Sequence, residues 1–346
     1  MASLKRIAAE LNVSYTLVSK VLSGRLGTTG VSEKTRHRIL KKAKEIDYVP
    51  NRLAVALKAG RKGAVGIFLH HVGSPGSDVS DRLLRGMAEG LERSGSRMWL
   101  RFFNTDKEFH VACDARLKSE VDGLIVVGAH HPGLVPKFRD LERERVPVVS
   151  IFTELPGRSR TEHTNVEVNY EAQGYLAARH LLEQGCRRLA CFRTIENRTE
   201  GFFRAHREAG IKPDPKLIIP TKAFDLCDGE RSLARLRESG VSFDGIVCQS
   251  DAQANGAINA LIRQGIDVPG QVKVTGVDNS PVAEDCIVPV TSVTSEMRHA
   301  GLQAVEVLLQ KIEGLPVSCP TIEPSLFIRK SSGGEPAEAA DFRCLD

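Results

Sequence analysis

The feature that most constrains the fold is an alternation of short apolar runs with amphipathic stretches, repeated twice along most of the chain. Continuous apolar strands separated by helices indicate parallel sheets that are covered on both faces. Two such series in succession therefore predict two doubly wound α/β lobes. We expect strands at 64–69, 97–103, 123–128 and 146–152 in the first series, and at 187–193, 216–220, 245–250 and 273–278 in the second.

Helices are expected between these strands, because the intervening segments carry apolar residues at helical spacing. They lie near 79–95, 107–119 and 134–145 in the first series, and near 170–184, 199–209, 228–239 and 251–264 in the second. The segments 291–314 and 325–330 would supply a last helix and a crossover strand. Residues 331–346 are predicted to be a disordered tail, because they carry little apolar surface to bury.

The first 48 residues predict three short helices instead. Residues 4–11 (LKRIAAEL) place their apolar side chains on one helical stripe, and Ser14 is placed to cap a second helix at 15–23. A third helix would begin at the N-cap Ser32 and run through Ile46. Two short helices joined by a three- or four-residue turn form the helix-turn-helix unit, whose second helix enters the major groove of DNA.

The predicted second helix has a polar face that suits contact with base edges. Val18, Val21 and Leu22 follow the spacing of a buried stripe. The opposite face is left to short or flexible side chains that can form hydrogen bonds: Tyr15, Thr16, Ser19 and Lys20.

The distribution of charge supports contact with DNA. The first 62 residues hold eight Lys and six Arg against four acidic residues, a net charge of +10. The rest of the chain holds 34 basic and 39 acidic residues, so the whole chain carries only +5. Positive charge concentrated in one sixth of a chain is typical of a module that binds phosphates. The alternative interpretation is a basic face that only contacts solvent.

These N-terminal segments resemble the headpiece of the lactose-repressor (LacI/GalR-type) regulators. The resemblance rests on V-S-Y-T-L-V-S-K-V-L-S-G, V-S-E-K-T-R-H-R-I and I-D-Y-V-P-N-R-L-A-V-A-L, which start at residues 13, 31 and 46. It implies a DNA-binding headpiece at 1–48, with Arg36, Asn51 and Arg52 on phosphates. The loop 25–30 (RLGTTG) is longer and richer in Gly than the family pattern, which puts a phosphate contact from this loop in doubt.

The same resemblance implies a hinge at 49–62. The run P-N-R-x-A-x-x-L includes Ala54 and matches position by position a segment that, in the family, becomes helical only on DNA. Such a segment is too short to form a stable helix alone. Leu57 matches the leucine that enters the minor groove, where a wedge unstacks a base step and bends the duplex. The alternative is a flexible linker with Leu57 packed on the core.

The body resembles the family's effector domain, which is of the periplasmic-binding-protein type. The matching segments are VDGLIVVG (121–128), PVVSIF (147–152), EAQGYLAARHLLEQGCRRLA (171–190), GVDNSP (276–281) and PVTSV (289–293). The resemblance thus covers roughly 3–330 and implies an effector-binding and dimerisation core at 63–330. Its N-lobe would comprise about 63–163 plus 292–319, and its C-lobe about 164–291 plus 320–330.

Candidate effector contacts come from strand ends, because open α/β sheets bind ligands at the carboxyl ends of their strands. Asp278 matches the family's acidic residue that accepts hydrogen bonds from effector hydroxyl or ring N–H groups. Asp251 is either a second such group or a helix cap. Arg198 matches an arginine that reaches effector oxygens, with surface solvation as the alternative. Phe224 matches an aromatic that stacks on sugars or bases, with an ordinary core position as the alternative.

Other positions depart from the family pattern. The loop 70–82 is about three residues longer than usual and lacks an aromatic pair, although Ser77 or Asp78 could point toward an effector. Asn169 replaces a common acidic residue, and Cys186 replaces a common His. The sequence therefore leaves open which effector is bound, and whether one is bound.

Enzymatic and metal-binding functions find little support. The chain has no dinucleotide-binding G-x-G-x-x-G after a strand, no Walker-type loop and no G-x-S-x-G elbow. The pairs at 70–71 and 130–131 are adjacent histidines, whose side chains point in different directions, so we expect no metal site. Eight scattered Cys without a C-x-x-C pair predict reduced core thiols rather than disulfides or a zinc site.

The sequence therefore predicts a transcriptional regulator rather than an enzyme: a homodimeric repressor of double-stranded operator DNA, controlled by a sugar or related metabolite and needing no cofactor. A solute-binding protein for transport and a sugar-modifying enzyme are the alternatives. The basic headpiece and the lack of an apolar signal segment argue against a transport protein. The lack of a catalytic constellation argues against an enzyme. We expect a cytoplasmic, nucleoid-associated protein without a membrane span.

Overall fold

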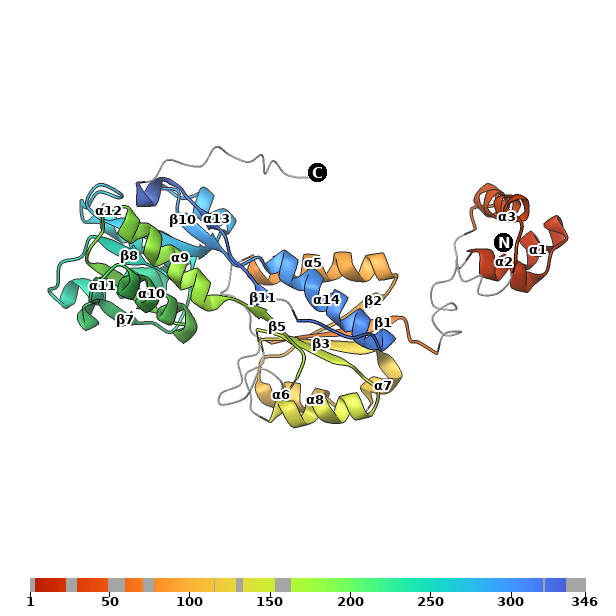
Figure 1. The fold of residues 1–346 in the computed structure, drawn as a ribbon. Helices are drawn as coiled ribbons and strands as arrows, with labels where there is room; N and C mark the ends of the chain where they lie inside the picture. Colours follow the sequence, from red (N-terminus) through yellow and green to blue (C-terminus); the bar gives the residue numbers. More distant parts are fainter. Residues whose placement is uncertain are drawn as a thin grey trace.

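The computed structural model describes residues 4–22, 30–48, 60–70, 78–114, 116–128, 133–152, 163–319 and 321–333. A small helical headpiece lies at the N-terminal end, and two α/β lobes follow it (Figure 1). This architecture confirms the predicted fold class of a helical headpiece and two lobes with largely parallel sheets.

The headpiece consists of α1 (Leu4–Leu11), α2 (Tyr15–Leu22) and α3 (Glu33–Glu45). Both predicted caps are confirmed: Ser14 Oγ accepts the Leu17 N–H at 3.1 Å, and Ser32 Oγ accepts the Thr35 N–H at 3.2 Å. Asn12 has φ 51° in the turn between α1 and α2, a conformation that Asn tolerates better than most residues. The helices bury a core of their own: Ile7, Ala8, Val18, Val21, Ile39 and Ala43.

In the N-lobe, the strand order of the described sheet is β11-β5-β4-β3-β1-β2. Its strands are β1 (Ala64–Leu69), β2 (Arg97–Phe102), β3 (Gly123–Val127), β4 (Val148–Ile151), β5 (Asn165–Val168) and β11 (Thr321–Ile322). Helices α5 (Val79–Ser94) and α14 (Met297–Glu313) cover one face, and α6 (Asp106–Ala112), α7 (Leu117–Glu120) and α8 (Leu134–Arg143) cover the other (Figure 1). The stretch 107–119, predicted as one helix, thus forms two.

In the C-lobe, the order of the described sheet is β12-β10-β9-β8-β6-β7, with β12 antiparallel to β10. Its strands are β6 (Leu189–Arg193), β7 (Ile218–Pro220), β8 (Gly245–Val247), β9 (Lys273–Asp278), β10 (Thr291–Thr294) and β12 (Leu326–Phe327). Helices α9 (Tyr170–Glu183) and α10 (Glu196–Glu208) pack on one face, and α11 (Leu226–Glu238) and α12 (Asp251–Arg263) on the other. The short α13 (Pro281–Glu284) follows β9.

The lobe boundaries differ from those predicted. β5 pairs with β4 and so belongs to the N-lobe, β10 pairs with β9 in the C-lobe, and β11 pairs with β5 in the N-lobe. The chain therefore passes between the lobes after 168, after 294 and after 322, rather than near 163, 291 and 319. The error arises because these short strands are placed by pairing with distant segments, which local apolar pattern does not reveal.

Two further predictions are corrected. β2 was predicted to be buried, but it is an edge strand on which Arg97, Arg101 and Phe102 are exposed. The disordered tail does not start at 331, because Ser331 and Ser332 are fully buried. Ser331 Oγ donates to the carbonyl of Val274 at 2.6 Å, which anchors the segment on β9. Residues 334–346 of the predicted tail lie outside the described residues.

Reciprocal glycines bring the main helix pairs into close contact. A Cβ atom at Gly86 of α5 would overlap the carbonyl oxygen of Arg298 on α14, and one at Gly301 of α14 would overlap that of Leu83 on α5. The same arrangement joins α9 to α10 through Gly174 and Gly201, and α11 to α12 through Gly229 and Gly256. Each pair therefore packs backbone against backbone at these glycines.

Candidate DNA-binding and interlobe sites

The headpiece presents the predicted polar face of α2 to solvent. Val18 and Val21 are buried, whereas Ser14, Thr16 and Tyr15 are exposed, Tyr15 at 43%. Ser19 and Lys20 are half-buried on the same helix. The structure therefore places these side chains where an external partner can reach them, on a helix held by a separate core.

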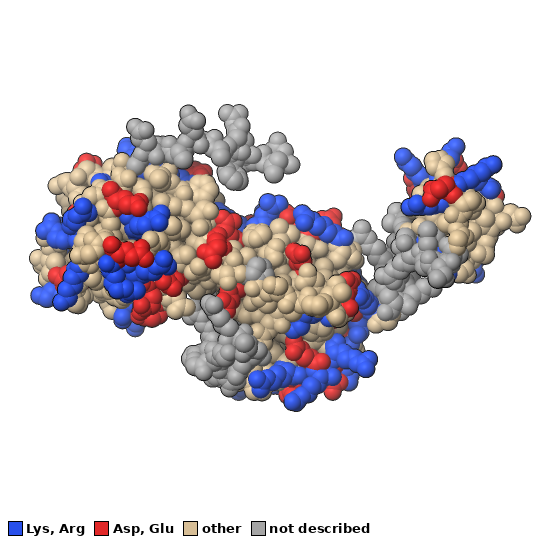
Figure 2. All heavy atoms as spheres, in the orientation of Figure 1, with Lys and Arg blue, Asp and Glu red and all other residues tan. Residues whose placement is uncertain are grey.

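Positive side chains also lie on the neighbouring helix α3. Figure 2 shows Lys and Arg side chains projecting from the headpiece over α3. Arg36 is exposed on α3 and forms only a 3.4 Å ion pair with Glu33, which leaves its guanidinium accessible to a phosphate. The predicted contacts Asn51, Arg52, Ala54 and Leu57 lie outside the described residues, as does most of the loop 25–30.

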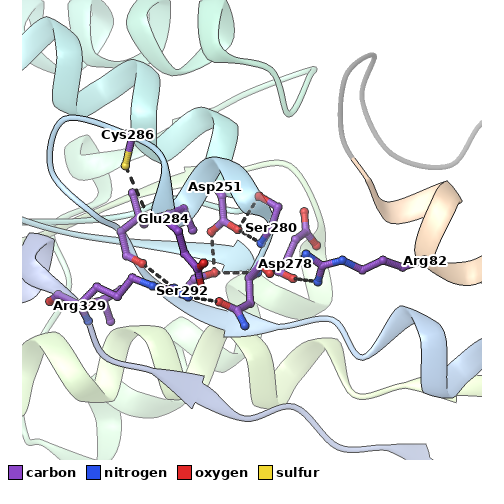
Figure 3. Close-up of polar contacts among 12 residues, drawn as sticks. Arg82, Asp251, Asp278, Ser280, Glu284, Cys286, Ser292 and Arg329 are labelled. Atoms are coloured by element: carbon purple, nitrogen blue, oxygen red, sulfur yellow. Dashed lines mark hydrogen bonds and ion pairs between the residues drawn. The ribbon is translucent and has the colours of Figure 1, made fainter. Parts of the chain in front are cut away.

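The candidate effector residues meet where the lobes join. We define the interlobe site as Asp78 and Arg82 from the N-lobe with Arg198, Asp251 and Asp278 from the C-lobe. Ser77 lies outside the described residues. Figure 3 shows Asp251, Asp278 and Arg82 around the turn that follows β9.

Asp278 ends β9 with φ 105°, in the left-handed region that side chains rarely adopt. Burial raises the pKa of its carboxyl to about 6; Arg198 opposes this rise most, Ser295 and then Arg82 oppose it less, and Asp78 adds to it. A carboxylate balanced between burial and two guanidinium groups gains from any further hydrogen-bond donor. This is the behaviour expected of a group that accepts hydrogen bonds from an effector.

Asp251 differs from Asp278, because the protein itself satisfies its carboxylate. It accepts hydrogen bonds from Ser280 N–H at 2.7 Å, Ser280 Oγ at 2.9 Å and Ser292 Oγ at 2.5 Å. Burial, and next the charge of Asp278, raise its pKa to about 7. Ser250, not Asp251, caps α12 by accepting the Gln253 N–H. These contacts favour a structural role for Asp251, holding the turn that carries Asp278.

Arg198 is 6% exposed, which excludes the alternative of surface solvation. Its Nε donates to Gln173 Oε1 at 2.7 Å, its Nη1 donates to the carbonyl of Gln249 at 2.6 Å, and its guanidinium lies 5.2 Å from the ring centre of Tyr170. Two of its nitrogens are thus engaged in holding it in place, as a recognition side chain requires.

Phe224 and the departures from the family pattern have defined positions. The Phe224 ring is half-buried and lies outside the apolar clusters of the described C-lobe, so it is not an ordinary core residue. Asn169 caps α9 by accepting the Ala172 N–H at 2.9 Å, and its amide donates to Glu323. Cys186 is buried, and its thiol donates to the carbonyl of Asp244.

Sequence reasoning missed the residues that organise the interlobe site, chiefly Arg82, Gln173 and Gln249. Arg82 ends the loop segment that the sequence singled out, but nothing local indicated its target in the other lobe. Gln249 lies near the end of the strand predicted at 245–250, and that position was the available signal. Polar residues with buried partners elsewhere in the chain leave no periodic pattern.

The cysteines of the described chain are free. Burial raises the pKa of Cys113 to about 12 and that of Cys191 to about 12, which favours the protonated thiol at both positions. Within the described ranges, no group of three or more His, Cys, Asp or Glu side chains could hold a metal ion. None of the described helices has both the length and the apolar character that crossing a membrane requires.

Comparison with known proteins agrees with this architecture. Residues 3–51 match the bacterial regulatory proteins of the lacI family, and residues 178–332 match the periplasmic binding protein-like domain. The repressor PurR of Aliivibrio salmonicida is 27% identical over 331 residues, covering 90% of this chain and 93% of the relative. The regulator DegA of Bacillus subtilis is 28% identical over 305 residues, covering 86% and 87%.

Solved structures share the fold over nearly the full chain. The regulator CelR in complex with cellobiose has a TM-score of 0.69 at 25% identity, covering 96% of this chain and all of CelR (100%). The lac repressor dimer bound to operator and the anti-inducer ONPF has a TM-score of 0.72 at 20% identity, covering 96% and 99%. The headpiece is thus that of the lacI family of bacterial regulatory proteins, joined to a periplasmic-binding-protein-like body.

Proposed function

We propose that this regulator is a homodimeric repressor that binds a pseudo-palindromic operator and responds to a small polar effector held between its lobes. The observation that carries the proposal is the polar face of α2, which stands on an independent three-helix core and is joined to a two-lobed body. Such a body can convert ligand binding into a change in headpiece spacing.

In the proposed complex, α2 enters the major groove. Tyr15, Thr16, Ser19 and Lys20 face base edges, while Ser14 caps the helix and Arg36 contacts phosphate. The segment 49–62 acts as the hinge, where Asn51 and Arg52 contact phosphate. Ala54 belongs to the same hinge motif, and Leu57 enters the minor groove at the centre of the operator.

The proposed effector contacts are Asp278, Arg198, Phe224, Asp78 and Ser77; Asp251 holds the turn that carries Asp278. A carboxylate, a fixed guanidinium and a half-buried ring together suit a molecule that combines hydroxyl groups with an apolar face. A sugar or related metabolite has this character, and CelR, which shares the fold, was solved with cellobiose. Neither a metal nor another cofactor is part of the proposal.

We place the dimer contact at the open edge of the N-lobe sheet. β2 is an edge strand, and unpaired edges tend to be covered by another chain. Phe102 on β2 and Val111 on α6 are each 63% exposed. They line a groove of about 640 Å³ together with Trp99, Arg101 and Phe103. A second copy that covered this groove would bury both side chains.

As a mechanism, effector binding changes the angle between the lobes and thus the distance between the two hinge segments. Two headpieces that each bind weakly bind tightly when the dimer holds them at the correct spacing. A coupling free energy on the order of 1–3 kcal/mol between effector and operator is enough for regulation. The protein would act on chromosomal DNA in the cytoplasm.

The test is selection of bound sequences from random DNA duplexes with the full-length protein at several salt concentrations. We expect an enriched inverted repeat with a central pyrimidine–purine step, because such steps bend easily. The enriched site then serves to screen sugars, nucleobases and their phosphates. Affinity that stays in the non-specific range of about 10⁻⁴–10⁻⁶ M, with and without pooled metabolites, would contradict the proposal.

A further inference from the structure

A single arginine joins the two lobes at the interlobe site. Arg82 lies on α5 of the N-lobe, where it forms an ion pair with Asp78 one turn earlier. Its Nη2 donates to the carbonyl of Asn279 at 2.7 Å, and its Nη1 donates to that of Asp278 at 3.3 Å. Figure 3 shows this side chain extending from α5 toward the turn after β9. Arg82 thus contacts two residues that lie 196 and 197 positions after it in the sequence.

The turn that accepts these hydrogen bonds is also held from within the C-lobe. Asp278 and Asn279 have φ values of 105° and 49°, so both occupy the left-handed region. The Asn279 N–H donates to Ser292 Oγ at 2.9 Å, and Arg329 Nη2 donates to Asn279 Oδ1 at 2.7 Å. A turn fixed on its own side transmits, rather than absorbs, a displacement of the arginine that contacts it from the other lobe.

The chemistry of arginine suits this position. Its planar guanidinium presents five N–H donors in a rigid fork, so it can bind a carboxylate and two neighbouring carbonyl oxygens together. The Arg82 side chain is 31% exposed, so its contacts are partly shielded from water. Its neighbour Arg85 forms an equivalent i,i+4 ion pair with Asp81 but is 70% exposed. Both arginines form the local helix contact, but Arg82 also contacts the other lobe, so comparing their variants isolates the effect of the interlobe contact.

We infer that Arg82 is a positioning residue that fixes the angle between the lobes, and with it the direction of the Asp278 side chain, before any effector binds. The interlobe contact is independent of the function proposed above; only the use of Asp278 by an effector rests on that function. Arg82 is then the point at which a ligand at Asp278 and the packing of α5 on α14 influence each other.

The test measures the distance between the lobes in the full-length protein, without DNA or effector. Cys227 on α11 and Cys319 beyond α14 are exposed thiols, one in each lobe. Nitroxide labels are attached to both after Cys286→Ser and Cys344→Ser substitutions, and pulsed electron paramagnetic resonance gives the distance distribution. An excess of unlabelled chain ensures that each measured pair lies within one chain.

We expect a narrow distribution for the parent protein and a broader one, with longer distances, for Arg82→Ala. Arg82→Lys should give an intermediate width, because an ammonium can still donate to one carbonyl. Arg85→Ala is the matched control and should leave the distribution unchanged. The inference is overturned if Arg82→Ala also leaves it unchanged, or if Arg85→Ala broadens it equally. Should Arg82→Ala fail to fold, judged by circular dichroism, Arg82→Gln is assessed by the same criteria.

A second measurement follows the pH dependence of thermal unfolding. The charged groups around the Asp278 carboxyl are Arg198, Arg82, Asp78 and the buried Asp251. Arg82 lowers the pKa of Asp278, whereas Asp78 raises it. Removing Arg82 should therefore raise the pKa of Asp278 further. Arg82→Ala should therefore lose more in melting temperature than the parent as pH rises through 6, and Arg85→Ala should not. Failure of operator selection would leave both measurements intact.

Discussion

At the scale of single residues, two buried carboxylates in the interlobe site have different roles because different partners surround them. Asp251 receives three hydrogen bonds from Ser280 and Ser292 and so holds a turn. Asp278, at the lobe junction, has different neighbours: Arg198 opposes the rise of its pKa most, and Ser295 and then Arg82 oppose it less. Asp278 is therefore the carboxylate that we expect a ligand to stabilise.

This difference predicts how stability depends on pH. Folding raises the pKa of Asp278 from 3.8 to about 6 and that of Asp251 from 3.8 to about 7, so between pH 4 and 7 the folded state binds more protons than the unfolded state. The contribution of these two carboxyls to stability is therefore largest at the acidic end of this window and is lost as pH rises through it.

Asp278→Asn should raise the free energy of unfolding at pH 8 by about 1–3 kcal/mol and change it little at pH 4. Asn also tolerates the positive φ at this position. Thermal unfolding across the pH range, with the exposed Asp285→Asn as control, measures the effect. Equal shifts at pH 4 and pH 8 would show that the buried charge is not the cause.

On the headpiece, Lys20 lies on the proposed base-reading face of α2, whereas Lys34 is exposed on α3. Lys20→Ala should lose about 1–3 kcal/mol at the selected operator and relax preference at one position of each half-site. Lys34→Ala should weaken binding to all sequences by a similar, smaller amount. Titration of both variants against the operator and a scrambled duplex decides between these roles. Uniform weakening by Lys20→Ala would assign Lys20 to the phosphates instead.

At the scale of elements, glycines set the spacing of the helix pairs. Because Gly86 and Gly301 lie against carbonyl oxygens of the opposing helix, α5 and α14 approach more closely than side chains would permit. α14 begins directly after the crossover at Thr294, so this contact also fixes how the chain leaves the C-lobe. The helix that carries Arg82 is thereby packed closely against α14.

Gly86→Ala should therefore destabilise the protein by about 1–3 kcal/mol, although alanine ordinarily favours a helix. The added Cβ would overlap the carbonyl oxygen of Arg298, which is backbone and can move only with α14. Denaturant unfolding, with the exposed Glu92→Ala on the same helix as control, gives the change in free energy. A neutral or stabilising result would mean that the two helices separate without loss of packing.

At the scale of the whole molecule, the three described crossovers between the lobes are tied to one another. Gln173 Nε2 donates to the carbonyl of Thr294 at 3.1 Å, and the Ser325 N–H donates to Thr294 Oγ1 at 2.9 Å. The Asn169 amide donates to Glu323, which joins the first crossover to the third. Because Gln173 also accepts from Arg198, a ligand on Arg198 would act directly on the segments about which the lobes move.

The proposed dimer contact is tested by Phe102→Glu, which places a charge on the exposed edge strand of the N-lobe. Burying an unpaired carboxylate in an interface is unfavourable, so the variant should be monomeric at concentrations where the parent is dimeric. Leu40→Glu changes a similarly exposed apolar side chain on the headpiece and should remain dimeric. Analytical ultracentrifugation without DNA gives the masses, and a dimeric Phe102→Glu would place the interface elsewhere.

The local sequence determined much of this protein. The helices of the headpiece, the caps at Ser14 and Ser32, and the main strands of both lobes follow from apolar periodicity and capping chemistry, which act over a few residues. The candidate positions at Asp278 and Arg198 came from a family resemblance, and the structure brings them together at the lobe junction. Their roles in binding remain predictions.

Only the tertiary structure decided the features that depend on distant contacts. The strands Asn165–Val168 and Thr321–Ile322 are too short and too polar to be recognised before they pair with each other. The roles of Gly86 and Gly301 depend on contact with the opposing helix, and the role of Arg82 depends on carbonyl groups in the other lobe. The physical reason is the same in each case: a contact between remote segments is specified by the packing of the whole chain, and neither segment carries a local pattern that reports it.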